Sequence, residues 1–324
     1  MNKNVLVIGG AGYIGSACVE ELIKNEFNVF VLDNLSTGQV EKVNKKAQMI
    51  HGDILDMAVL ENVFKDNEFE TVIHFAGKKA VGESEEFPEL YFENNVKGTL
   101  NILSMMSKYN VPKIIFSSTA AVYKPKDNEN AIYTEDSEVE PINVYGRTKL
   151  MCELIIKDYQ RLGKIKEYVI FRYFNVAGDT GLNYIEKNAQ NVFPLLTNAI
   201  LNGTEFKIFG DDYSTPDGSG VRDYIHLKDL VQAHVLGIGS VESGTYNLGT
   251  KNGFSVKELI QAFERITNKK MNVVIVEKRK GDPAIVIADS AKANNDLNWQ
   301  AKSTLDDMVT STLKAYGYVD DKLI

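Results

Sequence analysis

The sequence predicts an α/β fold: a doubly wound, parallel Rossmann sheet with helices on both faces, and a smaller mixed α/β part. Short apolar runs such as NVLVI, NVFVLD, TVIHFAG and KIIFSST recur in the first half, and they are continuously apolar rather than alternating. Such runs are typical of strands buried on both faces of a parallel sheet. Helical patterns separate them, and repeated strand-then-helix order is typical of doubly wound domains.

The first elements can be placed from their patterns. Residues 5–8 are expected to form a strand, and the stretch YIGSACVEELIKN follows it. Ile14, Cys18 and Leu22 recur at the spacing of one helix face, which predicts an amphipathic helix. A second strand is expected at residues 29–32, and later strands include one in YVIFRYF.

The character of the chain changes after about residue 175. The stretch VAGDTGLNYIEKNAQN is polar and has no clear periodicity, and a long segment rich in Gly and Asp follows. We expect residues 1–175 to form the doubly wound domain and residues 176–324 a smaller mixed α/β region. Some segments of the second part are expected to pack back on the first.

A glycine loop directly follows the first strand. In GGAGYIG, Gly9 suits a tight turn, Gly12 lets a pyrophosphate approach the backbone, and Gly15 lets helix and strand pack closely. Asp33 ends the next strand about 20 residues on, where a carboxylate can accept the ribose hydroxyls of a dinucleotide. This carboxylate favours NAD over NADP because it would repel a 2′-phosphate. Asp53 follows the third apolar run, where a contact with adenine and a helix cap remain open alternatives.

Tyr145 and Lys149 lie four residues apart in NVYGRTKL and share one face of a helix. A nearby ammonium would lower the pKa of the phenol from about 10 toward neutrality, so the tyrosine could act as a base. The strand FSSTAAVY precedes this pair and ends in Ser117, Ser118 and Thr119. Ligands collect at the carboxyl ends of strands in such sheets, which favours a catalytic pair over two solvated side chains.

Composition excludes several classes of function. The net charge is −8, which argues against binding nucleic acid or anionic membranes. Cys18 and Cys152 are too few for a disulfide scaffold or a four-cysteine zinc site, so buried free thiols are expected. No signal peptide or membrane span is recognisable, and a cytoplasmic location is expected.

The histidines predict no metal site. The four histidines, His51, His74, His226 and His234, show no spacing typical of metal ligands. His74 ends an apolar strand beside the expected cofactor loop. We therefore expect a hydrogen-bonded structural histidine at this position.

These features together resemble the extended short-chain dehydrogenase/reductase family. The motifs GGAGYIGS, DNLSTG, GDILD, HFAGKKAVGES, NNVKGT, FSSTAAVY, YGRTK, RYFN, GDDYSTPDGSGVRDYIH, YNLGT and RKGDPA occur in this order. Within the family they resemble the UDP-glucose 4-epimerases over nearly the whole chain. The resemblance implies a homodimer that interconverts UDP-glucose and UDP-galactose through transient oxidation at C4 by bound NAD. Residues 1–175 would bind NAD, and residues 176–324 the UDP-sugar.

The resemblance also implies residue roles. Tyr145 would be the base, Lys149 its partner and Thr119 a hydrogen-bonding residue for the reacting hydroxyl. NAD would contact Gly9, Gly12, Tyr13, Ile14, Gly15, Asp33, Asn34, Ser36, Gly38, Asp53, Ile54, Phe75, Ala76, Gly77, Lys79, Asn94, Ser117, Tyr145, Lys149 and Tyr173. The UDP-sugar would contact Thr119, Asn175, Asn191, Arg222, Arg279 and Asp282. For the two arginines, ordinary surface ion pairs with neighbouring aspartates are the alternative.

Some positions differ from the family pattern. Val176 stands where proline usually follows RYFN, Lys124 replaces the glycine of VYG, and residues 178–190 match poorly. Val286 aligns with a bulky aromatic that restricts N-acetyl sugars, so an epimerase for UDP-N-acetylglucosamine or one of dual specificity is an alternative.

Two further functions are alternatives. A 4,6-dehydratase would need an acid pair after Thr119, where Ala120 and Ala121 stand. The alternative of another class is an NAD-binding protein without enzymatic activity, against which the intact Thr119, Tyr145 and Lys149 argue.

Overall fold

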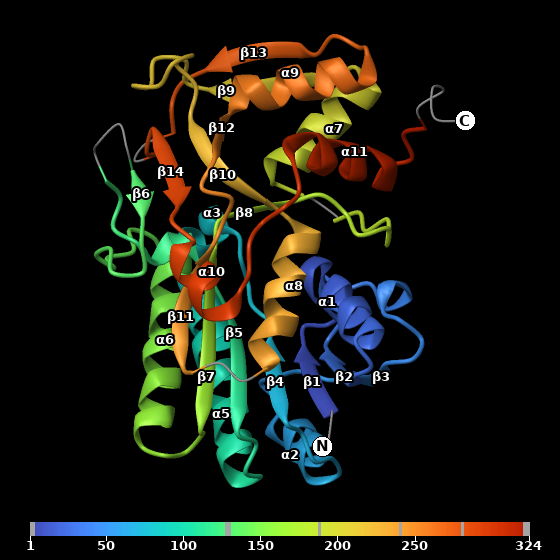
Figure 1. The fold of residues 1–324 in the computed structure, drawn as a ribbon, viewed down its shortest axis with the longest axis vertical. Helices are drawn as coiled ribbons and strands as arrows, with labels where there is room; N and C mark the ends of the chain where they lie inside the picture. The colour runs from blue at the N-terminus through green and yellow to red at the C-terminus, as the bar shows by residue number, and fades with distance from the viewer. Residues whose placement is uncertain (1–3, 127–130, 187–188, 240–241, 280–281, 320–324) are drawn as a thin grey trace.

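The computed structural model describes residues 4–126, 131–186, 189–239, 242–279 and 282–319. Its lower half in Figure 1 is a seven-stranded sheet with the order β11-β7-β5-β4-β1-β2-β3. Every pair of neighbouring strands in this sheet is parallel. The doubly wound fold is confirmed. The strands are β1 (Asn4–Ile8), β2 (Asn28–Asp33), β3 (Gln48–His51), β4 (Thr71–His74), β5 (Lys113–Thr119), β7 (Glu167–Tyr173) and β11 (Gly244–Leu248).

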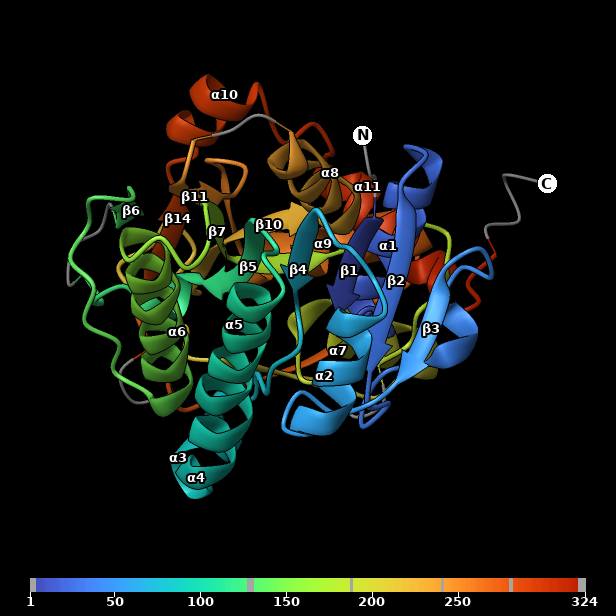
Figure 2. The same cartoon turned by 90° about the horizontal axis from the view of Figure 1, so that it is seen from below.

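Helices cover both faces of this sheet. One core contains Val5 and Val7 of β1 and packs under α1 and α8, whereas Leu6 and Ile8 point into the core under the opposite helices. Figure 2 shows α2, α5 and α6 side by side on that second face. The first face carries α1 (Tyr13–Lys24), α8 (Leu227–Ile238) and α10 (Ala291–Leu297), and the second carries α2 (Met57–Lys65), α5 (Gly98–Lys108) and α6 (Val144–Arg161).

Short helices connect β4 to α5. They are α3 (Val81–Glu86), α4 (Pro88–Tyr91) and a π-helical stretch, Phe92–Lys97. Two single 3₁₀ turns, Val40–Lys42 and Ala120–Val122, follow β2 and β5.

Most of the second half of the chain lies above the sheet in Figure 1. Its five-stranded sheet has the order β12-β10-β14-β6, with β8 paired to β10, and β9 pairs with β13 separately. A third core packs β8, β9 and β10 against three helices. The strands are β6 (Ile132–Tyr133), β8 (Asn175–Ala177), β9 (Glu205–Phe209), β10 (Val221–His226), β12 (Gly253–Ser255), β13 (Asn272–Val276) and β14 (Ile285–Ala288), and the helices are α7 (Val192–Asn202), α9 (Val256–Thr267) and α11 (Leu305–Ala315).

The chain returns to the first sheet after residue 175. Helix α8 covers one face, and β11 pairs with β7 from Gly244–Val169 to Leu248–Tyr173. The assignment of NAD binding to residues 1–175 and sugar binding to residues 176–324 stays a prediction.

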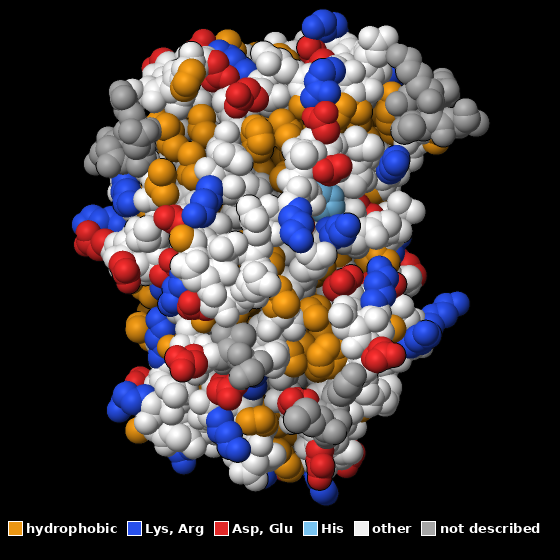
Figure 3. Space-filling model, viewed as in Figure 1, with side chains coloured by type: hydrophobic (Ala, Val, Ile, Leu, Met, Phe, Trp, Pro, Cys, Tyr) orange, Lys and Arg blue, Asp and Glu red, His pale blue; other side chains and the backbone are white. Residues whose placement is uncertain are grey.

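Charges are mixed on the molecular surface. Figure 3 shows basic and acidic side chains interspersed on the face seen in Figure 1. Among the helices of the described residues, none is long and apolar enough to cross a membrane. Both cysteines, Cys18 and Cys152, are buried free thiols, as expected.

Candidate active site

The glycine loop between β1 and α1 has the shape that the sequence predicts. Gly9 has a φ of +82°, and a Cβ at this position would lie 2.5 Å from the backbone nitrogen of Ala76. A Cβ on Gly15 would lie 2.1 Å from the carbonyl oxygen of Gly9, so Gly15 permits close packing. Gly12 is the N-cap of α1 and provides no side-chain cap. The first N–H groups of the helix, together with its dipole, therefore suit phosphate oxygens.

Asp33 lies beside this loop at the end of β2. Its Oδ2 accepts a hydrogen bond from the backbone nitrogen of Ala11 at 2.9 Å, and its Oδ1 accepts one from Leu35 at 2.8 Å. A carboxylate oxygen can accept more than one hydrogen bond, so Asp33 keeps capacity for ribose hydroxyls. The loop and this carboxylate together fit a dinucleotide.

Asp53 does not cap the helix that follows it. Its Oδ1 accepts from the backbone nitrogen of Leu55 at 2.8 Å, and its Oδ2 accepts from Asn34 Nδ2 at 2.8 Å. The N-cap of α2 is Asp56, whose carboxylate accepts two backbone N–H groups of that helix. The capping alternative for Asp53 is therefore wrong, and a contact with adenine stays a prediction.

Asn95 holds the loop after β4 against α6. Its Oδ1 accepts from the backbone nitrogen of Lys78 at 2.8 Å, and its Nδ2 donates to Thr148 Oγ1 at 3.1 Å. In the same loop, a Cβ on Gly77 would lie 3.2 Å from Lys149 Nζ. Asn95 lies in the π-helical stretch, and such stretches are frequent at functional sites. Sequence analysis selected its neighbour Asn94 and missed Asn95, because helix type cannot be read from the motif NNVKGT.

Tyr145 and Lys149 lie one turn apart on α6, and Thr119 ends β5 beside them. The side chain of Thr119 is hydrogen-bonded to Tyr145, and its Oγ1 also accepts from Ala121 N at 3.2 Å. Lys149 is buried, and its Nζ donates to the carbonyl oxygen of Ser117 at 2.8 Å. The structure therefore brings together the three residues for which the sequence predicts catalysis.

A glycine lets α6 approach this strand end. Asn143 caps the helix by accepting from the backbone nitrogen of Gly146 at 2.7 Å. A Cβ on Gly146 would lie 2.3 Å from the carbonyl oxygen of Ala121. The YGRTK motif thus needs its glycine for the packing of α6 against this strand end.

The pKa values correct one expectation. Burial raises the pKa of Tyr145 above 10.0, and the hydrogen bond with Thr119 partly lowers it. Burial lowers the pKa of Lys149 from 10.5 to about 8. The expectation that Lys149 brings the pKa of Tyr145 toward neutrality is wrong for this arrangement, because burial of the phenol outweighs the effects that favour the phenolate.

His74 is a structural histidine, as expected. It is buried, its Nε2 lies 3.0 Å from Thr99 Oγ1, and burial lowers its pKa to about 3. Within the described ranges, no three or more His, Cys, Asp or Glu side chains gather in a way that could hold a metal ion.

The two predicted arginines lie in different environments. Arg222 Nη2 donates to Asp282 Oδ1 at 2.5 Å, so the aspartate pairing weighed as an alternative is present. The side chains of Arg222 and Asp282 remain partly exposed, at 17% and 33%, respectively. Arg279 stacks on the ring of Phe209, with its guanidinium carbon 4.0 Å from the ring centroid. Both arginines therefore keep donors available to an anionic ligand.

Packing connects the strands that carry Arg222 and Val286 to the end of β5, where Thr119 lies. Val286 is the register partner of Arg222 in the second sheet. Val286 packs on a small core that contains Tyr123. Ala120 and Phe174 pack on the same core. Ala120 directly follows Thr119. The strand pair that carries Arg222 and Val286 is thus anchored next to the end of β5.

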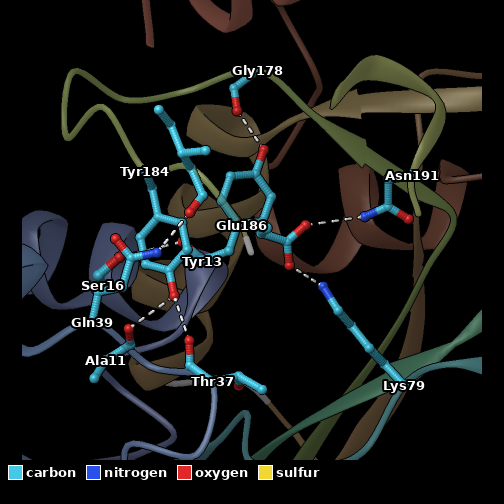
Figure 4. Close-up of polar contacts among 11 residues, drawn as sticks. Ala11, Tyr13, Ser16, Thr37, Gln39, Lys79, Gly178, Tyr184, Glu186 and Asn191 are labelled. Carbon is cyan, nitrogen blue, oxygen red and sulfur yellow. Dashed lines mark hydrogen bonds and ion pairs between the residues drawn. The ribbon is translucent and has the colours of Figure 1, made fainter. Parts of the chain in front are cut away.

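A further polar group lies beside the glycine loop, as Figure 4 shows. Glu186 forms an ion pair with Lys79 and accepts from Asn191 Nδ2 at 3.4 Å. Tyr13 donates to the carbonyl oxygen of Gly178. These residues, apart from Lys79, line one pocket. Glu186 was missed by sequence analysis because it lies in a stretch without a recognisable motif.

The remaining predicted residues fall into two groups. Tyr173 ends β7, with its hydroxyl bonded to that of Ser117, and Ile54 is buried with its Cδ1 2.4 Å from where a Cβ on Gly98 would lie. Asn175 begins β8 and is exposed. Most of the other predicted cofactor residues lie in the loops that follow strands of the first sheet: Gly9, Gly12, Asn34, Ser36, Gly38, Phe75, Ala76, Gly77 and Lys79. Tyr13, Ile14 and Gly15 form the first turn of α1.

Comparison with known proteins agrees with this site. The chain is 40% identical over 320 residues to UDP-glucose 4-epimerase of Bacillus subtilis, covering 94% of each chain. A UDP-glucose 4-epimerase from Brucella ovis, solved in complex with NAD, is 36% identical and superimposes with a TM-score of 0.92 over 97% of this chain and 98% of that one. The enzyme from Bifidobacterium longum, solved with NAD+ and UDP, is 38% identical, with a TM-score of 0.87 over 96% and 97% of the two chains.

The match to a family is also broad. Residues 5–249 match the NAD dependent epimerase/dehydratase family, and this range runs from β1 past the end of β11. It includes the glycine loop, the end of β5 and the helix that carries Tyr145 and Lys149. The chain belongs to the NAD-dependent epimerase/dehydratase family.

Proposed function

We propose that this protein is a UDP-glucose 4-epimerase that interconverts UDP-glucose and UDP-galactose. The observation that carries the proposal is the meeting of Thr119, Tyr145 and Lys149 beside a glycine loop that fits NAD. Relatives with the name UDP-glucose 4-epimerase match nearly the whole chain at about 40% identity. Val286, for which the resemblance implies a bulky aromatic in the family, concerns the choice of sugar rather than this chemistry.

The proposed cofactor residues bind and orient the dinucleotide. The N–H groups after Gly12 hold the phosphates, and Asp33 accepts the ribose hydroxyls. NAD, when bound, supplies transient oxidation at C4 and the return of hydride to the opposite face of the sugar. Lys79, Asn94, Tyr173 and the other residues implied by the resemblance are proposed to complete this site.

Tyr145 is proposed to move the proton of the sugar O4 hydroxyl. Thr119 donates to the phenol oxygen, and this hydrogen bond favours the phenolate and offsets part of the rise in pKa that burial causes. Lys149 is held by Ser117, with its ammonium over the ring of Phe116. We propose that Lys149 orients the bound ligands and places a positive charge near Tyr145, because its amine lies at the same strand end as this proposed base.

The proposed UDP-sugar residues lie on the second half of the chain. Arg222 and Arg279 suit diphosphate oxygens because guanidinium groups bind phosphate with two donors at once. Asp282 already fixes Arg222 through its ion pair. Asn175 and Asn191 are proposed to donate to the same ligand.

We also propose that the protein is a cytoplasmic homodimer. Leu100 on α5 and Met151 and Leu154 on α6 expose 42%, 41% and 54% of their surface. Helices α5 and α6 are neighbours, and exposed apolar side chains on such a helix pair are what a second copy could cover. Buried free thiols at Cys18 and Cys152 suit a reducing compartment.

The test is conversion of UDP-galactose to UDP-glucose by the purified protein, with products resolved chromatographically and no stoichiometric reductant added. Wild type should reach an equilibrium mixture. Tyr145→Phe should lose about 10²–10⁴-fold in turnover while it retains bound NAD. Tyr159→Phe, on the same helix with its hydroxyl near Ser104, is the matched control and should remain active. Substantial turnover by Tyr145→Phe would contradict its role, and a wild type that binds NAD without epimerising any sugar would contradict the function.

A further inference from the structure

Residues 178–186 form an ordered segment that reaches from the second half of the chain to the cofactor loops. Asp179 organises its turn: Oδ1 accepts from the backbone nitrogens of Gly181 at 2.6 Å and Asn183 at 3.0 Å, and Oδ2 accepts from Tyr184 at 3.0 Å. The backbone nitrogen of Asp179 donates a further hydrogen bond to Ser311 Oγ at 3.1 Å. The segment is therefore held in one shape by its own side chain and by α11.

Tyr184 fastens this segment to two loops at once. Its hydroxyl lies 3.2 Å from the carbonyl oxygen of Ala11, in the glycine loop, and 3.3 Å from that of Thr37, in the loop after β2 (Figure 4). The side chain of Tyr184 is buried, and its ring centroid lies 5.8 Å from that of Tyr13. One phenol from residue 184 thus contacts both loops that are proposed to hold the NAD phosphates and ribose.

Two side chains from the loop after β2 hold the same segment from the other side. Gln39 Nε2 donates to the carbonyl oxygen of Ile185 at 2.7 Å. Lys42 Nζ donates to the carbonyl oxygens of Leu182 at 3.0 Å and Asn183 at 2.8 Å. Neither Lys42 nor Tyr184 is among the residues proposed to contact NAD or sugar, so their contacts with the segment can be tested separately.

The end of the segment reaches a third loop. Glu186 pairs with Lys79, which lies in the loop after β4. The segment therefore contacts the loops after β1, β2 and β4, and these three loops surround the proposed dinucleotide site. Contacts that tie these loops together would oppose the release of a dinucleotide bound between them.

We propose that the 178–186 segment retains NAD, and that Tyr184 and Lys42 are the positioning residues that fasten it. The inference rests on the proposed function and deepens it. An epimerase recovers its oxidised cofactor within each turnover, so release of NAD serves no step of the reaction. Contacts that keep the loops closed would therefore slow cofactor release without entering the chemistry.

Cofactor release can be measured directly. The holoenzyme is loaded with radiolabelled NAD and chased with excess unlabelled NAD, and the label that stays with the protein after gel filtration is followed over time. Tyr184→Phe removes one hydroxyl and keeps the ring, and we expect NAD release to become about three- to tenfold faster. Lys42→Met keeps the aliphatic stem, loses both hydrogen bonds, and should accelerate release in the same direction.

Tyr109→Phe is the matched control, because its hydroxyl bonds Glu61 near the amino end of β5, away from the cofactor loops. Its release rate should equal that of wild type. Release from Tyr184→Phe and Lys42→Met at the rate of this control would overturn the inference and leave the proposed function untouched. Conversely, a protein that exchanges NAD as expected but epimerises no sugar would overturn the function and leave the retention result standing.

Discussion

Glu153 on α6 and Arg172 on β7 form a buried ion pair with two hydrogen bonds. Nε of Arg172 donates to Oε1 at 2.9 Å, and Nη2 donates to Oε2 at 2.6 Å. Ser118 adds a third bond by donating to Oε1 of Glu153. Since Glu153 follows Lys149 by one helical turn, the pair fixes α6 to β5 and β7 at the level of the catalytic residues.

Loss of the arginine should destabilise the fold strongly. Arg172→Met leaves the carboxylate of Glu153 buried without its counter-ion, and we expect the free energy of unfolding to fall by about 3–5 kcal/mol. Urea unfolding measures this change. The control is Arg161→Met, which removes a partner of Asp158 from an exposed pair and should cost less than about 1 kcal/mol. Equal losses in the two variants would contradict the structural importance of the buried pair.

The hydrogen bond between Thr119 and Tyr145 should control the pH dependence of turnover. The bond lowers the pKa of Tyr145 against the rise caused by burial, so its removal in Thr119→Val should raise that pKa further. Because the phenolate is the proposed base, the acidic limb of the profile of kcat/KM against pH should move to higher pH. We expect turnover at neutral pH to fall by about tenfold or more, as for loss of one oriented donor. Thr119→Ser keeps the hydroxyl and should retain the wild-type profile, and an unchanged profile in Thr119→Val would contradict the assignment.

Lys149 should make stability depend on pH. Burial lowers its pKa in the folded protein to about 8 from 10.5, so the unfolded chain binds more protons between these values. Stability should therefore rise as pH increases from about 8 to 10.5, and the full cost of the buried charge should be present below pH 8. Other groups also titrate in this range, so the measurement is the difference in unfolding free energy between cofactor-stripped wild type and Lys149→Met. A difference that stays constant between pH 7 and 10 would show that Lys149 keeps its ordinary pKa.

Val286 provides a test of sugar specificity. It packs on the same small core as Ala120, which directly follows Thr119, and its side chain is only partly buried. If valine leaves room for an N-acetyl group, wild type should also epimerise UDP-N-acetylgalactosamine. Val286→Tyr should then lower kcat/KM for that substrate by about tenfold or more while it spares UDP-galactose. A wild type that acts on UDP-galactose alone would reject dual specificity.

Local patterns predicted the parts of the site that depend on neighbours in sequence. The glycine loop, Asp33 and the pair Tyr145 and Lys149 could be recognised because strand, turn and helix follow each other directly. Glu153 could also have been found, since it continues the spacing of Tyr145 and Lys149 along one helix face. Its partner Arg172 required the packing of α6 against β7.

Other features depend on contacts between distant parts of the chain. Tyr184 contacts residues more than 140 positions away, and no periodicity in its stretch indicates such a partner. The pKa of Tyr145 could not be predicted from helical spacing either, because burial by the surrounding fold outweighs its local neighbours. The same holds for β11, whose place beside β7 is decided by long-range pairing rather than by its short motif.

The position of β11 has a consequence for biosynthesis. Strand β7 is fully synthesised at Tyr173, but its neighbour β11 is complete only when the ribosome has synthesised the chain to Leu248. During that interval the nascent chain carries an unpaired strand edge, whose N–H and C=O groups can pair with other nascent chains. Translation that stalls or terminates between these two positions would therefore yield a product prone to aggregate, however complete its glycine loop and catalytic helix.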